Sequence, residues 1–186
     1  MKSKVWLYQV LMVMVLAQPL VAAAHPFHWA RDSMDFVGGL LHPFTSLDHV
    51  LTLLVVGFGM ARTSKRVLYY LPIAFVIWML LGCALALMAM EWGWAENAMY
   101  LGMFLLSVLL ITGRQIPLLI TMPIMASVAV LHGYTHAYDI WLDVDAIDFT
   151  AGFAVSTLAL LLFGFVGMRF LDSCVLKYAQ HWAIKP

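Results

Sequence analysis

The sequence predicts an all-α protein, a polytopic membrane helical bundle with about five transmembrane helices after an N-terminal signal peptide. Hydrophobic residues make up 64% of the chain and charged residues 11%, whereas soluble domains carry about a quarter charged residues. The apolar residues form runs of about the 20 residues that a helix needs to cross a bilayer. No run alternates with the period of a strand. The expected surroundings are therefore a lipid bilayer.

The composition also limits which classes of molecule the chain is expected to bind. The formal net charge is zero, and no basic run with interleaved aromatic residues is present to follow a phosphate backbone. The sequence therefore gives no indication of nucleic acid binding. Neither a cysteine cluster nor a nucleotide-binding loop is evident, so any ATP-driven step would need a partner protein. We expect no enzyme and assign no catalytic residue.

The first residues have the pattern of a secretory signal peptide. Two lysines precede an apolar run at residues 5–16, and small residues follow up to Ala24. We therefore expect residues 1–24 to be a leader and residues 25–186 to form one transmembrane domain. An uncleaved signal anchor is the alternative.

Cleavage after Ala24 would place a histidine at the new N-terminus. The free α-amine and imidazole of His25, with His28 nearby, would then offer nitrogen ligands for capturing a metal outside the membrane. The alternative is that both histidines are simply solvated in a short exposed segment.

The first span is predicted at residues 35–61 and contains His42, Asp48 and His49. In one continuous helix His42 and His49, seven residues apart, share a stripe that begins at Asp35, and Asp48 lies off this stripe. Ionisable groups at membrane depth are costly and usually functional. The alternative is that the histidines only form hydrogen bonds between helices.

A proline within this first span should also alter its backbone. Pro43 has no N–H to give to the carbonyl of Gly39. We therefore expect a carbonyl oxygen without a donor beside the polar stripe.

Four more spans are predicted at residues 67–90, 98–112, 116–137 and about 146–170. Charges sort between the loops that connect them. The basic residues on one side are Arg62, Lys65, Arg66, Arg114, Arg169, Lys177 and Lys185, and the acidic residues on the other are Glu91, Glu96, Asp139, Asp143 and Asp145. The positive-inside rule then predicts a multi-pass protein of the bacterial cytoplasmic (inner) membrane, with the mature N-terminus outside and the C-terminus in the cytoplasm.

The fourth span ends in a second group of polar residues. His132 and His136 are four residues apart and Asp139 lies seven after the first, so one helical face holds all three. This histidine spacing offers two nitrogens to one metal ion. The predicted orientation brings the group to the same leaflet as His42. Imidazoles and carboxylates without a thiolate suit nickel, cobalt, zinc or copper.

The chain has two cysteines, Cys83 and Cys174, and both are expected to be free thiols.

Both polar groups resemble signatures of the HupE/UreJ family. Residues 42–49 resemble its first-helix signature, His-Pro-x-x-Gly-x-Asp-His, and residues 132–136 resemble the start of its fourth-helix signature, His-Gly-x-Ala-His-Gly-x-Glu. The Gly-Phe pair of the fifth helix is at residues 152–153. The resemblance implies a nickel or cobalt permease that serves hydrogenase and urease maturation. The departures are Ser46 for Gly, Thr135 for Ala, Ala137 for Gly, Asp139 for Glu, and Leu161 where the family commonly carries a histidine.

The resulting functional prediction is a permease for a divalent transition-metal ion. Nickel is the expected substrate, with cobalt and zinc as alternatives, and no permanently bound cofactor is expected. The outer ligands are expected to be His132, His136 and Asp139, and the deeper ones His42, Asp48 and His49.

Two other functional classes remain open from the sequence. One is an electron-transfer protein that holds b-type haem between histidines of the first and fourth helices. The other is a structural or assembly subunit. A homo-oligomer and a complex with metalloenzyme-maturation proteins are both compatible with the chain.

Overall fold

The computed structural model describes residues 35–45, 47–61, 70–88, 92–111, 117–138 and 145–183. The predicted leader, His25, His28 and Asp139 lie outside these residues. Within them the chain is helical and contains no strand, which confirms the all-α prediction for this part. The elements are α2 (Phe36–Leu41), the 3₁₀ helix η2 (His42–Phe44), α3 (Leu47–Met60), α4 (Leu71–Ala86), α5 (Ala95–Ile111), α6 (Leu118–Tyr138) and α7 (Ala146–Ala183).

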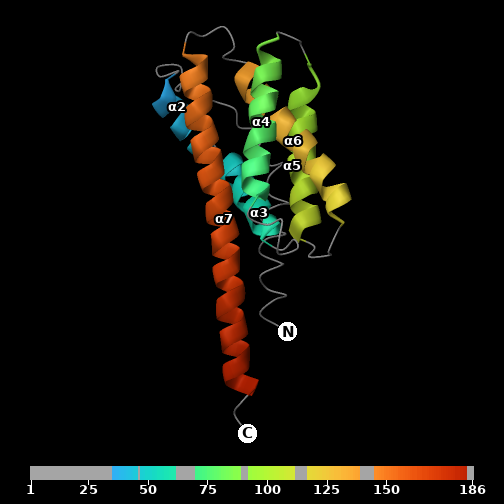
Figure 1. The fold of residues 1–186 in the computed structure, drawn as a ribbon, viewed down its shortest axis with the longest axis vertical. Coiled ribbons are helices and arrows are strands. Elements are labelled where there is room, and N and C mark those ends of the chain that lie inside the picture. Colours follow the sequence, from blue (N-terminus) through green and yellow to red (C-terminus); the bar gives the residue numbers. More distant parts are fainter. Residues whose placement is uncertain are drawn as a thin grey trace.

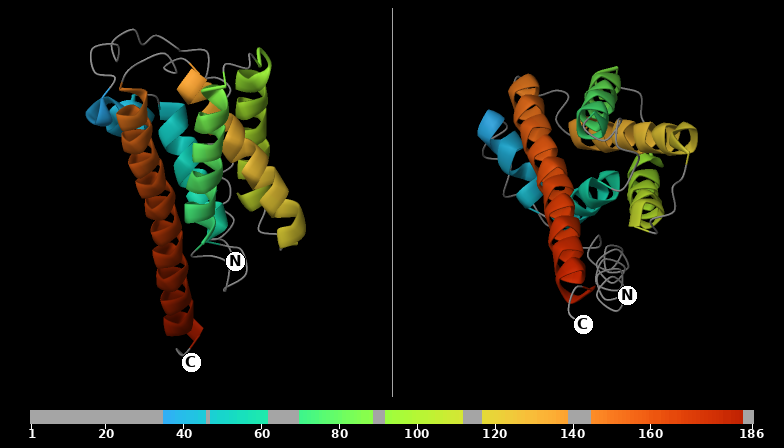
Figure 2. Two further views of the ribbon diagram at one scale, coloured as in Figure 1. Left: turned by 45° about the horizontal axis from the view of Figure 1, so that its top comes forward. Right: turned by 60° about the horizontal axis from the view of Figure 1, so that its bottom comes forward.

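The helices from α3 to α7 form a bundle in which successive helices run in alternating directions (Figure 1). Helix α6 packs between α4 and α5, and α7 packs against α2, α3 and α4 (Figure 2). The start of α3, the end of α6 and the start of α7 therefore lie at the same end of the bundle. The far end of α7 projects beyond the other helices (Figure 1).

The prediction of one continuous first helix is wrong. The segments Phe36–Phe44 and His49–Met60 are bent by 78° relative to each other. Pro43 is the physical reason, because its ring and missing N–H prevent the α-helical hydrogen-bond ladder from continuing. After it the hydroxyl of Thr45 donates to the His42 carbonyl at 2.7 Å, and the Thr45 amide donates to the same oxygen at 3.1 Å.

This break also removes the expected bare carbonyl and the expected stripe. The amide of His42 donates to the carbonyls of both Gly38 and Gly39, so the Gly39 oxygen has a donor and that prediction is wrong. Asp35 acts as the N-cap of α2 instead of extending a polar stripe. Its Oδ1 accepts a hydrogen bond of 2.8 Å from the Gly38 amide.

The later helices begin close to their predicted positions. Helix α7 starts at Ala146 as expected but continues to Ala183, past the predicted end at residue 170. The added residues contain neither proline nor glycine, so nothing in the local sequence stops the helix.

Helix length and composition support fewer spans than the sequence predicts. In the described residues, Ala146–Cys174 is long and apolar enough to cross a bilayer, and the bent pair Phe36–Phe44 with His49–Met60 would be a second candidate if it forms one broken span. Helix α4 is apolar but shorter. The total of about five spans therefore stays a prediction.

Glycines bring the backbones of α4 and α6 into direct contact. A Cβ on Gly82 would collide with the carbonyl oxygen of Val130, and a Cβ on Gly133 would collide with that of Met79. Small residues at such contacts are typical of helix packing in membranes. The second contact fixes the part of α6 that carries His132 and His136.

Candidate metal centre

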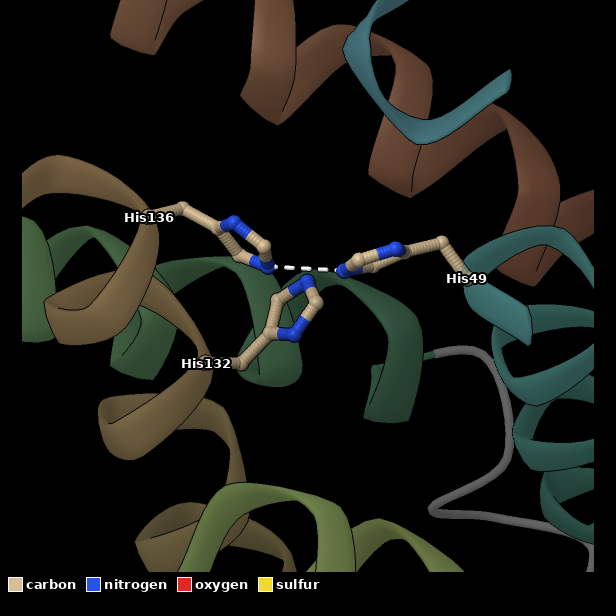
Figure 3. A group of neighbouring side chains, drawn as sticks. All are labelled: His49, His132 and His136. Atoms are coloured by element: carbon tan, nitrogen blue, oxygen red, sulfur yellow. Dashed lines mark hydrogen bonds between the residues drawn. The ribbon is translucent and has the colours of Figure 1, made fainter. Parts of the chain in front are cut away.

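Three histidines from two helices converge near the end of the bundle where α6 finishes. His49 lies on the first turns of α3, and His132 and His136 project from one face of α6 (Figure 3). One ring nitrogen from each residue lies within 4.8 Å of the others. His49 and His132 are buried and His136 is half-buried. Three imidazole nitrogens grouped in this way can hold a metal ion.

His136 is the central member of a chain of histidine contacts. Its Nε2 lies 2.9 Å from Nε2 of His49, and its Nδ1 lies 3.2 Å from Nε2 of His42. A neutral imidazole carries a proton on one nitrogen and accepts with the other. His136 can therefore donate to one of these neighbours while it accepts from the other.

His42 reaches this group because of the break in the first helix. Its ring centroid lies 4.9 Å from that of His136 and 6.0 Å from that of His49. The grouped ligand nitrogens of the described residues come from His49, His132 and His136. His42 is not one of this group and instead contacts His136 at its other nitrogen, Nδ1. The two polar segments therefore meet in the structure, whereas their place in one leaflet and the order of outer and deeper ligands stay predictions.

His132 offers a nitrogen that the described residues do not satisfy. The residue is 1% exposed, and its Nε2 has no hydrogen-bond partner there. A buried polar atom without a partner costs about 1 to 3 kcal/mol. Because this nitrogen belongs to the group formed with His49 and His136, it is suited to bind a ligand.

Aromatic rings of α7 cover the histidines on one side. The Phe153 ring is 1% exposed and lies 5.5 Å from His42, 5.4 Å from His132 and 5.1 Å from His136, centroid to centroid. Phe149 adds a contact of 5.4 Å with His42. The wall keeps water away from one side of the nitrogens, which strengthens electrostatic interactions there. Its contacts could not be read from the sequence, where Phe153 appeared only as half of the Gly-Phe pair.

Other predicted site residues are not placed by the structure. Asp48 belongs to the first turn of α3, but its side chain is outside the described residues, as are Asp139, His25 and His28. Leu161, where a histidine was expected by resemblance, is fully buried, eight residues beyond Phe153. That is about 12 Å along the helix, well away from the cluster.

The cysteines follow the prediction. Cys83 and Cys174 are both free, the first buried and the second exposed. The Cys83 thiol donates to the carbonyl oxygen of Gly133 at 3.4 Å. It therefore supports the backbone of α6 and does not belong to the group of histidine ligands.

Comparison with known proteins covers a range that includes both histidine segments. The family model described as HupE / UreJ protein matches residues 11–183. Protein HupE of Rhizobium leguminosarum bv. viciae is similar to this chain, with 31% identity over 157 residues, 83% of this chain and 81% of the relative. No solved structure matches the chain significantly. The chain therefore belongs to the HupE/UreJ family.

Proposed function

We propose that this protein is an inner-membrane permease that takes up a divalent transition-metal ion, with nickel as the main substrate and cobalt and zinc as alternatives. The observation that carries the proposal is the convergence of ring nitrogens from His49, His132 and His136 within 4.8 Å. Membership of a family of nickel and cobalt accessory proteins supports the choice of ion. Helix α7, which is able to span a bilayer, supports the membrane location.

The spacing of the nitrogens is compatible with a small ion. Two ligands bound at a right angle, each at about 2.1 Å from a metal, lie about 3.0 Å apart. The Nε2 atoms of His49 and His136 are separated by 2.9 Å. Right-angled sites with nitrogen ligands are typical of nickel(II) and copper(II). The two nitrogens already have this separation, and both rings must turn so that they point at the ion instead of at each other.

Metal binding would redistribute the proton between these rings. An ion that takes the Nε2 atoms of His49 and His136 replaces the proton that they share, because a ligating imidazole nitrogen must be deprotonated. The proton of His136 then belongs on Nδ1, where the His42 Nε2 lies 3.2 Å away as an acceptor. A ligating histidine commonly donates its second nitrogen in this way, which fixes its tautomer and orientation.

The same geometry disfavours a haem between these two residues. Axial imidazoles on opposite sides of an iron need a separation of about 4 Å between their nitrogens, with metal–nitrogen bonds of about 2 Å each. His49 and His136 are in direct contact at 2.9 Å. A porphyrin would have to separate α3 from α6 before it could enter.

In the proposed pathway the ion enters from the outside. Acidic loops raise the local cation concentration, His25 and His28 add outer capture, and Asp139 and Asp48 supply carboxylates near the cluster. The ion is then released on the cytoplasmic side, where metalloenzyme-maturation proteins receive it. The C-terminus faces the same compartment.

Metal accumulation in cells tests the transport function. Cells that express the intact chain are expected to accumulate nickel above an empty-vector control, and His49→Ala or His132→Ala is expected to abolish the gain at matched membrane levels. His181→Ala, far along α7, is the control that keeps uptake. Elemental analysis of nickel, cobalt and zinc identifies the substrate. Equal uptake by the intact chain and both cluster variants would contradict the proposal.

Uptake is also expected to depend on external pH. Imidazoles must be neutral to bind the ion, and an ordinary histidine has a pKa of about 6.5. Lowering the external pH from about 7.5 to about 5.5 should therefore decrease the initial rate of nickel uptake. Uptake measured at a fixed free nickel concentration that stays constant over this range would argue against histidine ligation.

A further inference from the structure

A layer of buried hydroxyl groups lies next to the histidine cluster. The buried polar side chains of the described residues are His49 and His132 together with three hydroxyl residues, namely Thr52, Ser156 and Thr157. Further along the bundle the fully buried side chains are apolar, among them Leu161, Met60 and Met168. In the part of the chain that the structure describes, these hydroxyl groups are thus the deepest buried polar groups past the cluster.

Two contacts of helix α7 show where Thr157 lies along the length of the bundle. One turn before it, the Phe153 ring stacks on His132 at 5.4 Å. One turn after it, the backbone of Leu161 approaches α3 so closely that a Cβ on Gly57 would collide with the Leu161 carbonyl oxygen. Residues four apart share a helical face, so Thr157 lies between the cluster and this contact, on the face of Phe153.

Thr52 lies on helix α3 at the same level along the bundle as Thr157. Thr52 follows His49 by three residues and shares its face, and Gly57, at the contact with α7, comes five residues later. The two helices pack together and run in the same direction (Figures 1 and 2). Both threonines therefore lie about one helical turn, roughly 5 Å, beyond the cluster.

The hydroxyl of Thr157 differs from that of its neighbour Ser156. Ser156 is 2% exposed, and its Oγ donates within the helix to the carbonyls of Gly152 at 3.2 Å and Phe153 at 3.1 Å. Thr157 is fully buried, and its Oγ1 has no hydrogen-bond partner in the described residues. Threonine in a helix usually satisfies its hydroxyl on a preceding carbonyl. The Thr157 hydroxyl is thus left unsatisfied next to a candidate metal site.

We infer that Thr157, with Thr52 at the same depth, forms a second and weaker station for the divalent cation and its bound water. The inference rests on the proposed transport function and adds the step that follows the histidine cluster. A hydroxyl group can accept from or donate to a water of the ion's hydration shell. Neutral oxygen groups bind a borderline ion less tightly than imidazoles do. Transport requires such weaker stations, because an ion held only by strong ligands does not leave.

The test separates binding from transport with the full-length protein. Nickel binding is measured by calorimetry in detergent, and initial nickel uptake is measured in proteoliposomes that contain a nickel-sensitive dye. Thr157→Val is expected to bind nickel with an affinity within about twofold of the intact protein, because the cluster is unchanged. Its uptake at saturating nickel is expected to fall by roughly tenfold, the size of a lost hydrogen bond to a charged group.

Two further variants show whether the hydroxyl itself matters. Thr157→Ser is expected to restore most of the uptake, because it keeps the hydroxyl. Ser156→Ala, the matched control one residue away, should leave uptake unchanged because its hydroxyl is used within the helix. Thr157→Val should also melt at or above the temperature of the intact protein, because it removes an unsatisfied buried group.

Each contrary outcome has a distinct meaning. If the intact protein takes up none of nickel, cobalt and zinc, the proposed function is wrong and the second station is wrong with it. If the intact protein takes up nickel and Thr157→Val does so at the same rate, only the second station is wrong. A Thr157→Val variant that loses nickel binding or melts earlier would also overturn the inference, because its hydroxyl would then support the cluster or the fold.

Discussion

Replacing His136 with alanine is expected to abolish nickel binding to the purified protein. His136 contacts His49 through Nε2 at 2.9 Å and His42 through Nδ1 at 3.2 Å, so its loss removes one of the three ligands and the hydrogen bonds that orient the neighbouring rings. His49 and His132 would be left as a pair of imidazoles, which is too few ligands to hold the ion. Calorimetry in detergent should show no binding up to millimolar nickel.

His42→Ala provides the graded comparison for that result. His42 contacts the far nitrogen of His136, so it is expected to orient a ligand through a hydrogen bond. The loss of such a support typically costs about 10-fold to 100-fold in metal affinity. We therefore expect weaker but measurable binding for His42→Ala. Equal losses for the two variants would show that His42 ligates the ion directly, and unchanged binding in His136→Ala would remove this cluster as the site.

The sequence was sufficient to predict that the two polar segments lie toward the same end of the bundle. His42 and His49 lie early in one apolar run, whereas His132 and His136 lie late in another. Two helices of opposite direction bring an early and a late segment to the same end of a bundle, and side chains of the two segments are in contact in the structure. Figure 3 shows this contact for His49 and His136. The positions of α4 to α7 were also predictable, because each of these apolar helices follows a charged or aromatic loop.

The details of the cluster were not predictable from periodicity. Pro43 indicated a disturbed helix, but the 78° bend depends on how η2 and Thr45 satisfy the freed carbonyls. The bend places His42 against Nδ1 of His136, whereas a continuous helix would place it on the same stripe as His49. The wall formed by Phe153 depends on the packing of α7 against the other helices, which no local pattern records. Asp48 and Asp139 remain predictions because the Asp48 side chain and the whole of Asp139 lie outside the described residues.

Gly133→Ala is expected to weaken nickel binding although it changes no ligand. A methyl group at this position would collide with the Met79 carbonyl oxygen of α4. Alanine favours a helix over glycine by about 1 kcal/mol, but a collision with backbone atoms cannot be relieved by a side-chain rotation. Helix α6 must therefore move away from α4, and it carries His132 and His136 with it.

The expected loss follows from the precision that a metal site requires. Ligands displaced by more than about 0.5 Å no longer match the productive geometry, and losing ligand orientation costs about 10-fold to 100-fold in affinity. Calorimetry should show this decrease, together with a lower melting temperature. Gly167→Ala on α7 is the matched control, because its added Cβ would meet the Phe58 ring at an ordinary 3.5 Å. If Gly133→Ala binds nickel as well as this control does, contact with α4 does not position the ligands. The two histidines of α6 would then be held mainly by their contacts with α3 and with Phe153.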